Sequence, residues 1–229
     1  MGRWLIRLAF LLMLACLLAA PRWVRAGKFN RVLSVGDVAP PWENLEGTDG
    51  RRHSLAELSE ARLVVLIFTS HRCPIARGYD ERLVELYNEV SDAGVRMVAI
   101  ESGGPAERTL EKMRQRAQEA GYHFAYLHDA GLNLCRAYGA TCTPTVFVLV
   151  PRADERCQPR FAIAYQGAID DSADARRVRR PYLRQTIEAL LAGRQPPMAE
   201  TRPTGCEIPG SQDNQTDSPD ADAPAADGP

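Results

Sequence analysis

The feature that most constrains the fold is an unbroken apolar run, residues 63–67 (LVVLI), that continues directly into residues 68–74 (FTSHRCP). A run without polar alternation is typical of a strand that is covered on both faces. Apolar residues then recur at helical spacing from residue 79 to residue 90. Cys73 therefore lies where a buried strand passes into a helix, and the unpaired N–H groups of a helix start favour the thiolate form of cysteine. We predict thiol redox chemistry at Cys73.

Strand and helix patterns alternate along the rest of the chain. We expect strands at 63–68, 95–100, 124–127, 145–150 and 161–166, and helices at 79–90, 105–120, 132–138 and 181–191. A helical crossover between the first two strands implies parallel pairing, and the short link between the last two strands favours a hairpin. Upstream, Asp49-Gly50 predicts a tight turn between short strands. The predicted fold class is α/β, with a central mixed β-sheet flanked by helices.

The N-terminus has the composition of an export signal. Two arginines precede an apolar stretch, residues 8–20, and residues 24–26 (VRA) offer a small-residue cleavage site. We therefore expect a signal peptide over residues 1–26, with an uncleaved membrane anchor as the alternative. Only that anchor would bring the protein to a membrane. The predicted location is the periplasm or cell envelope.

The C-terminus also differs in composition from the centre of the chain. Residues 209–229 contain five Asp and no basic residue, and they show no apolar periodicity. Such a segment cannot bury enough apolar surface to fold, so we expect an acidic disordered tail. The predicted domain spans residues 28–208.

Composition narrows the classes of partner and cofactor. The formal net charge of -1 gives no reason to expect a nucleic-acid partner. Histidines are scattered, and His71 with Cys73 is a weak metal signal because a structural zinc site usually needs four ligands. We expect no metal and no organic cofactor. The basic cluster within residues 176–180 is interpreted as a solvated face, with a docking site for an acidic partner as the alternative. The acidic pair Asp170-Asp171 is interpreted as part of a turn, with a border of the active-site cleft as the alternative.

Export changes the interpretation of the cysteines, because disulfides persist outside the cytosol. Five cysteines remain after removal of the predicted signal, namely Cys73, Cys135, Cys142, Cys157 and Cys206. An odd number leaves at least one thiol free or paired with another molecule. Cys157 lies in a polar stretch, and pairing with Cys206 or with another chain is one alternative for it.

Several spaced motifs resemble one family. They are residues 36–40 (GDVAP), 73–76 (CPIA), 138–144 (YGATCTP), 165–171 (YQGAIDD) and 200–208 (ETRPTGCEI). Together they resemble the redoxins grouped with alkyl hydroperoxide reductase and thiol-specific antioxidant proteins, in particular an exported bacterial branch called peroxiredoxin-like or thioredoxin family proteins. The resemblance implies a thioredoxin fold, an active-site Cys73, and Pro144 as the cis-proline beside it.

The chain departs from both mechanisms that this resemblance offers. Many relatives carry Cys-x-x-Cys-Pro, and Ser70 stands where the first, attacking cysteine would be. Peroxiredoxins carry Thr or Ser three residues before their reactive cysteine, which Ser70 fits, but Leu66 replaces their upstream proline and Pro144 occupies about the place of their peroxide-activating arginine. Ser70 can donate a hydrogen bond to the thiolate or to a peroxide, or it can cap the helix.

A second thiol is needed to release an oxidised Cys73 as an internal disulfide. Cys142 is the leading candidate, because it lies two residues before Pro144, which the fold would place at the active site. Cys135 is the second candidate, and a bond between Cys135 and Cys142 or two inert thiols are the alternatives.

The functional prediction is an exported thiol oxidoreductase. Its single helix-N-terminal cysteine, Cys73, would attack a peroxide or a disulfide of a protein or small molecule, and an unidentified external reductant would restore it. The predicted site comprises Cys73, Ser70 and Pro144. The alternative is a non-catalytic thioredoxin-fold module for binding or redox sensing, in which Pro144 helps to hold an extended partner segment.

Overall fold

The structure, a computed structural model, describes residues 27–104, 109–153 and 159–211. Its main sheet has the strand order β2-β1-β5-β4-β3-β7-β8, and β6 pairs with β9 in a separate two-stranded sheet. The predicted export signal, Cys157 and nearly all of the predicted acidic tail lie outside the described residues. Among the described helices, none is both long and apolar enough to cross a membrane.

The elements alternate in the order that the sequence predicts. The strands are β1 (Leu45–Gly47), β2 (Arg52–His53), β3 (Leu63–Thr69), β4 (Val95–Glu101), β5 (Ala125–His128), β6 (Cys142–Thr143), β7 (Thr145–Ala153), β8 (Pro159–Gly167) and β9 (Cys206–Glu207). The α-helices are α2 (Pro74–Arg77), α3 (Asp80–Val90), α4 (Thr109–Ala120), α5 (Asn133–Tyr138) and α6 (Tyr182–Leu191). Single 3-10 turns are η1 (Leu55–Leu58), η2 (Ser91–Ala93) and η3 (Ala175–Arg177).

The apolar run at residues 63–67 forms the middle of the sheet, as predicted. Strand β3 pairs in parallel with β4 and antiparallel with β7, and all of its residues are buried. Successive side chains of a strand point to opposite faces. Val64, Leu66 and Phe68 accordingly join one apolar cluster, and the residues between them join the other. The chain thus forms the predicted thioredoxin-like α/β fold.

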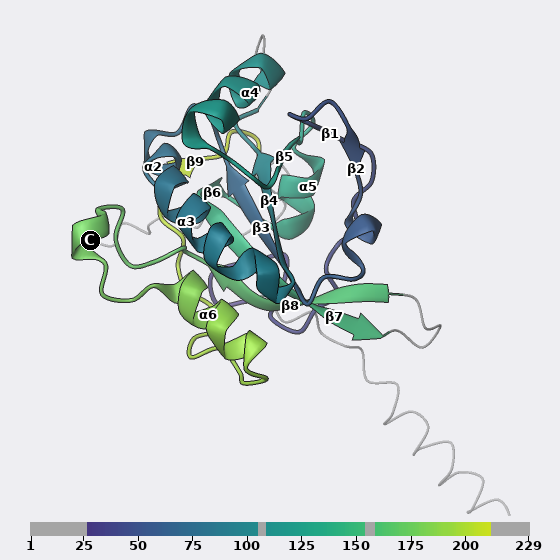
Figure 1. Cartoon of the computed structure of the whole chain (residues 1–229), viewed down its shortest axis with the longest axis vertical. Helices are drawn as coiled ribbons and strands as arrows, with labels where there is room; N and C mark the ends of the chain where they lie inside the picture. Colours follow the sequence, from purple (N-terminus) through teal and green to yellow (C-terminus); the bar gives the residue numbers. More distant parts are fainter. Residues whose placement is uncertain (1–26, 105–108, 154–158, 212–229) are drawn as a thin grey trace, which may run out of the picture.

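Helices cover both faces of the sheet. Residues of α3, α4 and α6 pack in the cluster on one face, and residues of α5 and the segment before β3 pack in the cluster on the other. Figure 1 shows α3 and α6 in front of the sheet. The predicted tight turn at Asp49-Gly50 is confirmed, since it joins β1 and β2, which pair antiparallel, and Gly50 adopts a φ of 77°. Glycine reaches this conformation without steric cost.

The sequence patterns missed the small sheet of β6 and β9. Its strands have two residues each and lie more than sixty positions apart, at Cys142–Thr143 and Cys206–Glu207. Antiparallel pairing brings the segment after α6 back across the end of β7. That segment, residues 198–211, is called the C-terminal strap below.

Burial on both faces makes β3 sensitive to truncation. We expect Leu66→Ala, at a fully buried side chain, to lower the free energy of unfolding by about 2–5 kcal/mol, because the substitution removes apolar contacts and leaves a cavity. Urea denaturation followed by far-UV circular dichroism measures the change. The matched control is Val38→Ala, at a side chain that is 41% exposed, where we expect a change within about 0.5 kcal/mol. Equal losses in both variants would contradict the central position of β3.

Candidate active site: Cys73, Cys206 and the cis-proline turn

A tight turn follows β3 and carries Cys73 to the start of α2. The Cys73 N–H donates to the Ser70 carbonyl at 3.1 Å, and the Ser70 Oγ accepts from the Arg72 N–H at 3.1 Å. Cys73 is itself the N-cap of α2, and its Sγ accepts from the Ala76 N–H at 3.3 Å. The expectation that Ser70 caps the helix is therefore wrong in detail, because Ser70 closes the turn and the sulfur of Cys73 caps. Within the described residues, the Ser70 hydroxyl makes no hydrogen bond to the Cys73 sulfur.

Cys73 is joined to Cys206 by a disulfide that spans 133 residues of sequence. The two Cα atoms lie 5.9 Å apart, within the usual range for disulfides. Antiparallel pairing of β6 and β9 sets Cys206 opposite Thr143, whose carbonyl oxygen lies 3.3 Å from the Cys73 Sγ. A reduced Cys73 thiol can donate to that carbonyl. Cys73 is 2% exposed and Cys206 is partly exposed.

Backbone approach at Gly205 brings Cys206 into reach. A Cβ atom at residue 205 would lie 1.9 Å from the Thr143 carbonyl oxygen, closer than real Cβ contacts, and 3.1 Å from the Pro144 nitrogen. Only glycine fits there. The peptide bond from Thr143 to Pro144 is cis, as the resemblance implied. The C-terminal strap thus lies directly against the cis-proline peptide.

The structure corrects the prediction that Cys142 is the leading partner of Cys73. Opposite residues of an antiparallel pair share a face and successive residues alternate. Thr143 and Cys206 therefore point to one face of the small sheet, and Cys142 points to the other with Glu207. The Cys142 Sγ lies 3.7 Å from the Thr145 Oγ1, and burial raises the pKa of the Cys142 thiol.

Cys135 is also unbonded and has no contact with Cys73. Its Sγ donates to the Ala140 carbonyl at 3.0 Å, and burial raises the pKa of the Cys135 thiol to about 12. The alternative of a bond between Cys135 and Cys142 is likewise not formed. Pairing of Cys157 with Cys206 is excluded in this structure, because Cys206 is bonded to Cys73.

A buried carboxylate holds the other side of the Cys73 turn. Glu101, at the end of β4, is 1% exposed and accepts from the His71 N–H at 2.9 Å, the Gly103 N–H at 3.0 Å and the Tyr126 hydroxyl. The His71 Nδ1 lies 3.3 Å from a Glu101 carboxylate oxygen. Burial alone would raise the pKa of Glu101, but these hydrogen bonds and His71 hold that pKa below its usual value.

A buried arginine, Arg116, extends this cluster of polar groups. Arg116 is 3% exposed and donates to both carboxylate oxygens of Asp80, at 2.6 and 3.0 Å, and to the Thr69 Oγ1 at 3.1 Å. It also lies 3.2 Å from the Tyr126 hydroxyl. Glu101 and Arg116 were not among the predicted site residues. The one available signal was an acidic residue at the end of a mostly apolar strand, beside the strand that leads to Cys73.

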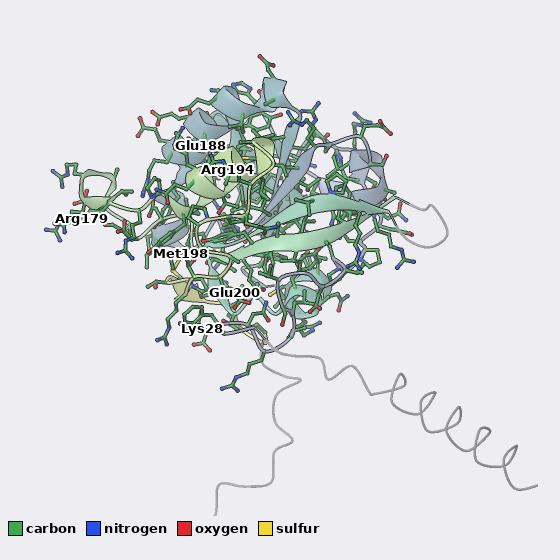
Figure 2. The ribbon with its side chains drawn as sticks, turned by 90° about the horizontal axis from the view of Figure 1, so that it is seen from below. Lys28, Arg179, Glu188, Arg194, Met198 and Glu200 are labelled. Atoms are coloured by element: carbon green, nitrogen blue, oxygen red, sulfur yellow. A yellow bond between two sulfur atoms is a disulfide. The ribbon has the colours of Figure 1, made fainter. Side chains whose placement is uncertain are left out.

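The residues predicted at the surface have local partners. Asp170 accepts from the Tyr79 hydroxyl at 2.9 Å and pairs with Arg82, and Asp171 accepts from two backbone N–H groups within residues 179–180. These contacts match the turn role. Asp170 is nevertheless buried, and both aspartates also line a groove beside Pro144, as the alternative expected. Figure 2 shows Arg179 on a loop that projects from the body of the molecule. No group of three or more His, Cys, Asp or Glu in the described ranges could hold a metal ion.

A groove lies beside the cis-proline. It has a volume of about 410 Å³, and Ile75, Tyr79, Pro144 and Thr204 are among the residues that line it. Met198 and Glu200 of the strap and Lys28 also line it, and Figure 2 labels all three on the same side of the molecule. The groove therefore connects the surface of α2 with the strap that carries Cys206.

Comparisons with known proteins identify the family of this chain and proteins of similar fold. Residues 35–154 match the AhpC/TSA family. The curated thiol-disulfide oxidoreductase ResA of Halalkalibacterium halodurans is 31% identical over 105 residues, which are 46% of this chain and 57% of that relative. The chain thus matches little more than half the length of the curated relative.

Two solved structures are similar over most of their length. The hypothetical protein SMc02350 of Sinorhizobium meliloti 1021 is 28% identical with a TM-score of 0.67, and the match covers 78% of this chain and 96% of that one. An uncharacterized conserved protein of Geobacillus kaustophilus is 30% identical with a TM-score of 0.67, and the match covers 76% and 91%.

The contact at Gly205 predicts that a single methyl group prevents the disulfide. In Gly205→Ala the added Cβ meets the Thr143 carbonyl, so β9 must move away and Cys206 loses its reach to Cys73. After oxidation by air, which leaves no adduct on unpaired thiols, unfolding and labelling with iodoacetamide, we expect two more labelled thiols than in wild type. Gly78→Ala is the control, at a φ of −64° with no atom closer than 3.3 Å. A wild-type label count in Gly205→Ala would refute the argument.

The lowered pKa of Glu101 predicts a pH dependence of stability. Because the pKa in the folded state lies below the ordinary value of 4.5, Glu101 stabilises the fold above that pH, and this stabilisation is lost as the pH falls through the folded-state pKa. Between pH 7 and pH 3 we expect Glu101→Gln to lose less free energy of unfolding than wild type, as measured by urea titration at each pH. Glu119→Gln, at a half-exposed side chain, should follow wild type.

Proposed function

Because the chain belongs to the AhpC/TSA family, we propose that it is a thiol–disulfide oxidoreductase that cycles Cys73 and Cys206 between disulfide and dithiol. The observation that supports this most is the bond between the cysteine of the strand-to-helix turn and a cysteine of the C-terminal strap. Ser70 occupies the position of the first cysteine in a Cys-x-x-Cys motif, and Cys206 supplies the missing second sulfur from a distant part of the chain.

Anchors on both sides of Cys206 support reversible opening and closing. Before it, the Thr201 N–H donates to the Gln166 carbonyl at 3.1 Å, and the Thr201 Oγ1 lies 2.6 Å from the Tyr165 hydroxyl. After it, the Ile208 N–H donates to the Thr141 carbonyl at 2.9 Å, and Ile208 is 1% exposed. These contacts do not depend on the disulfide. Reduction therefore leaves the two thiols close together and ready to close again.

The substrates proposed are thiols and disulfides of proteins or small molecules. The name of the ResA relative supports exchange between sulfurs as the reaction class. Pro144 contributes by covering Cys73 through the cis peptide, which sets the Thr143 carbonyl 3.3 Å from the sulfur. Ser70 contributes by closing the turn. The two electrons move between sulfur atoms, so the reaction requires neither a metal nor an organic cofactor.

Peroxide is the second candidate substrate. Attack by a Cys73 thiolate on a peroxide oxygen would give a sulfenic acid, and condensation with the Cys206 thiol would then form the disulfide and release water. In that sequence Cys206 takes the resolving role that the sequence analysis assigned to Cys142 or Cys135. Ser70 gives the peroxide route little support. Its Oγ accepts from the Arg72 N–H and, within the described residues, makes no hydrogen bond to the Cys73 sulfur.

The alternative from the sequence analysis, a non-catalytic binding or sensing module, also has an observation in its favour. Cys73 is 2% exposed and the strap is anchored on both sides of Cys206, features that suit a permanent structural disulfide as well. The two hypotheses differ in one measurable property, exchange of the disulfide while the protein stays folded.

We propose that residues 1–26 act as an export signal, so that this chemistry takes place in the periplasm or cell envelope, a compartment that permits disulfides. An external reductant or oxidant of the thiol class would then complete each cycle. This location is part of the proposal.

A redox titration of the folded protein tests the function. In glutathione buffers of increasing reducing strength, we expect wild type to gain two alkylatable thiols, assigned by peptide mass spectrometry to Cys73 and Cys206, with an unchanged far-UV spectrum. Cys142→Ser, which removes a partly exposed thiol outside the pair, should titrate like wild type. Cys206→Ser should show no two-electron step. A disulfide that opens only on unfolding would favour the structural alternative.

A further inference from the structure

We propose that the substrate is joined to the protein through Cys206, on the C-terminal strap, and that Cys73 is the internal sulfur that leaves and returns. This inference rests on the proposed function. It reverses the roles expected from the sequence, in which Cys73 attacks the substrate and a second cysteine resolves the intermediate.

Access to the two sulfurs of the disulfide differs. Thiol–disulfide exchange needs a thiolate to approach one sulfur along the line of the S–S bond, from the side opposite the other sulfur. An attacker on Cys73 must therefore reach the side of its sulfur that faces away from Cys206. Cys73 is only 2% exposed, so a substrate has little access to that sulfur.

Cys206 offers the open approach. It is partly exposed, and its neighbours Thr204 and Glu207 are exposed. Gly205 lies against the cis-proline peptide, and the next residue of the strap, Cys206, is more exposed than the Cys73 to which it is bonded. The same strap forms part of the groove beside Pro144, and Thr204, two residues before Cys206, lines this space for a substrate group.

The hydrogen bonds of the two sulfurs identify the better leaving group. A thiolate leaves faster when its pKa is lowered, and an N–H donor stabilises the negative sulfur. Cys73 has such a donor in Ala76, whereas no N–H in the described part of the chain donates to the Cys206 sulfur. Breaking the bond toward Cys73 is therefore favoured over breaking it toward Cys206.

The reaction balances in two exchanges. A substrate thiolate bonds to the Cys206 Sγ, the bond between Cys206 and Cys73 breaks, and Cys73 leaves with the electron pair as a thiolate. A second substrate thiolate then attacks the substrate sulfur of this mixed disulfide and releases Cys206 as a thiolate. Two substrate thiols become one disulfide, and Cys73 and Cys206 take up protons as two thiols. Reduction of a substrate disulfide is the reverse, through the same mixed disulfide on Cys206.

Two trapping variants of the full chain test the assignment. Cys73→Ser keeps only Cys206 of the pair, and Cys206→Ser keeps only Cys73. With glutathione disulfide as the probe, we expect glutathione to attach to Cys206 in the first variant about tenfold faster than to Cys73 in the second, because access governs the rate. Peptide mass spectrometry assigns each adduct, which separates it from labelling of Cys142, and far-UV circular dichroism confirms that both variants are folded.

A measurement on wild type keeps the assignment testable if a variant fails to fold. Oxidised wild type is mixed with reduced glutathione and quenched in acid within seconds, and the first adduct is mapped. Glutathione on Cys206 with a free Cys73 supports the proposal, and glutathione on Cys73 with a free Cys206 overturns it. Faster trapping of Cys73 in the variants overturns it as well.

Failure of the proposed function gives a different result. In that case the wild-type disulfide accepts no electrons from glutathione in the folded state and no adduct forms on either cysteine. Turnover of the disulfide with the adduct on Cys73 would instead retain the function and reject only this assignment of roles.

Discussion

Backbone contact between Gly205 and the Thr143–Pro144 peptide is the constraint on which the site depends. It lets β9 pair with β6, and this pairing sets Cys206 opposite Thr143 and within bonding distance of Cys73. The main sheet alone would present a single buried cysteine at a helix start. The site is therefore built from two parts of the chain. One is the strand-to-helix turn that carries Cys73, and the other is the C-terminal strap that carries Cys206.

The turn that carries Cys73 is held from two directions. On the β4 side the Glu101 carboxylate binds the His71 and Gly103 N–H groups, so it ties the turn to the next loop. On the β7 side the turn meets Thr143 through the Cys73 sulfur. A Cβ on Gly103 would lie 2.3 Å from the Ser70 Oγ, so there is no spare volume between the two loops. A turn fixed in this way changes little when its sulfur changes oxidation state.

Much of the fold could be predicted from the sequence because it follows from burial. The run at residues 63–67 indicated a strand covered on both faces, and its junction indicated a reactive position at Cys73. The partner of Cys73 escaped prediction for a physical reason, since two-residue strands have no periodicity and their pairing depends on a close approach at Gly205. Cys142 is near Pro144 in sequence, but alternation along β6 turns its side chain to the other face. Glu101 was hidden at the end of an apolar strand.

The disulfide closes a ring of 133 residues, from the turn after β3 to the strap, and that ring contains most of the sheet. Closing a ring of this size restricts the unfolded chain by about 5 kcal/mol in the chain-entropy account. By the thermodynamic cycle, the disulfide then forms more favourably in the folded chain than in the unfolded chain by the same amount. The effect of the disulfide on folding stability and the effect of folding on the redox potential are therefore one quantity measured in two ways. A substitution that weakens both folded forms equally leaves the potential unchanged, whereas one that loosens only the strap anchors at Thr201 or Ile208 shifts both.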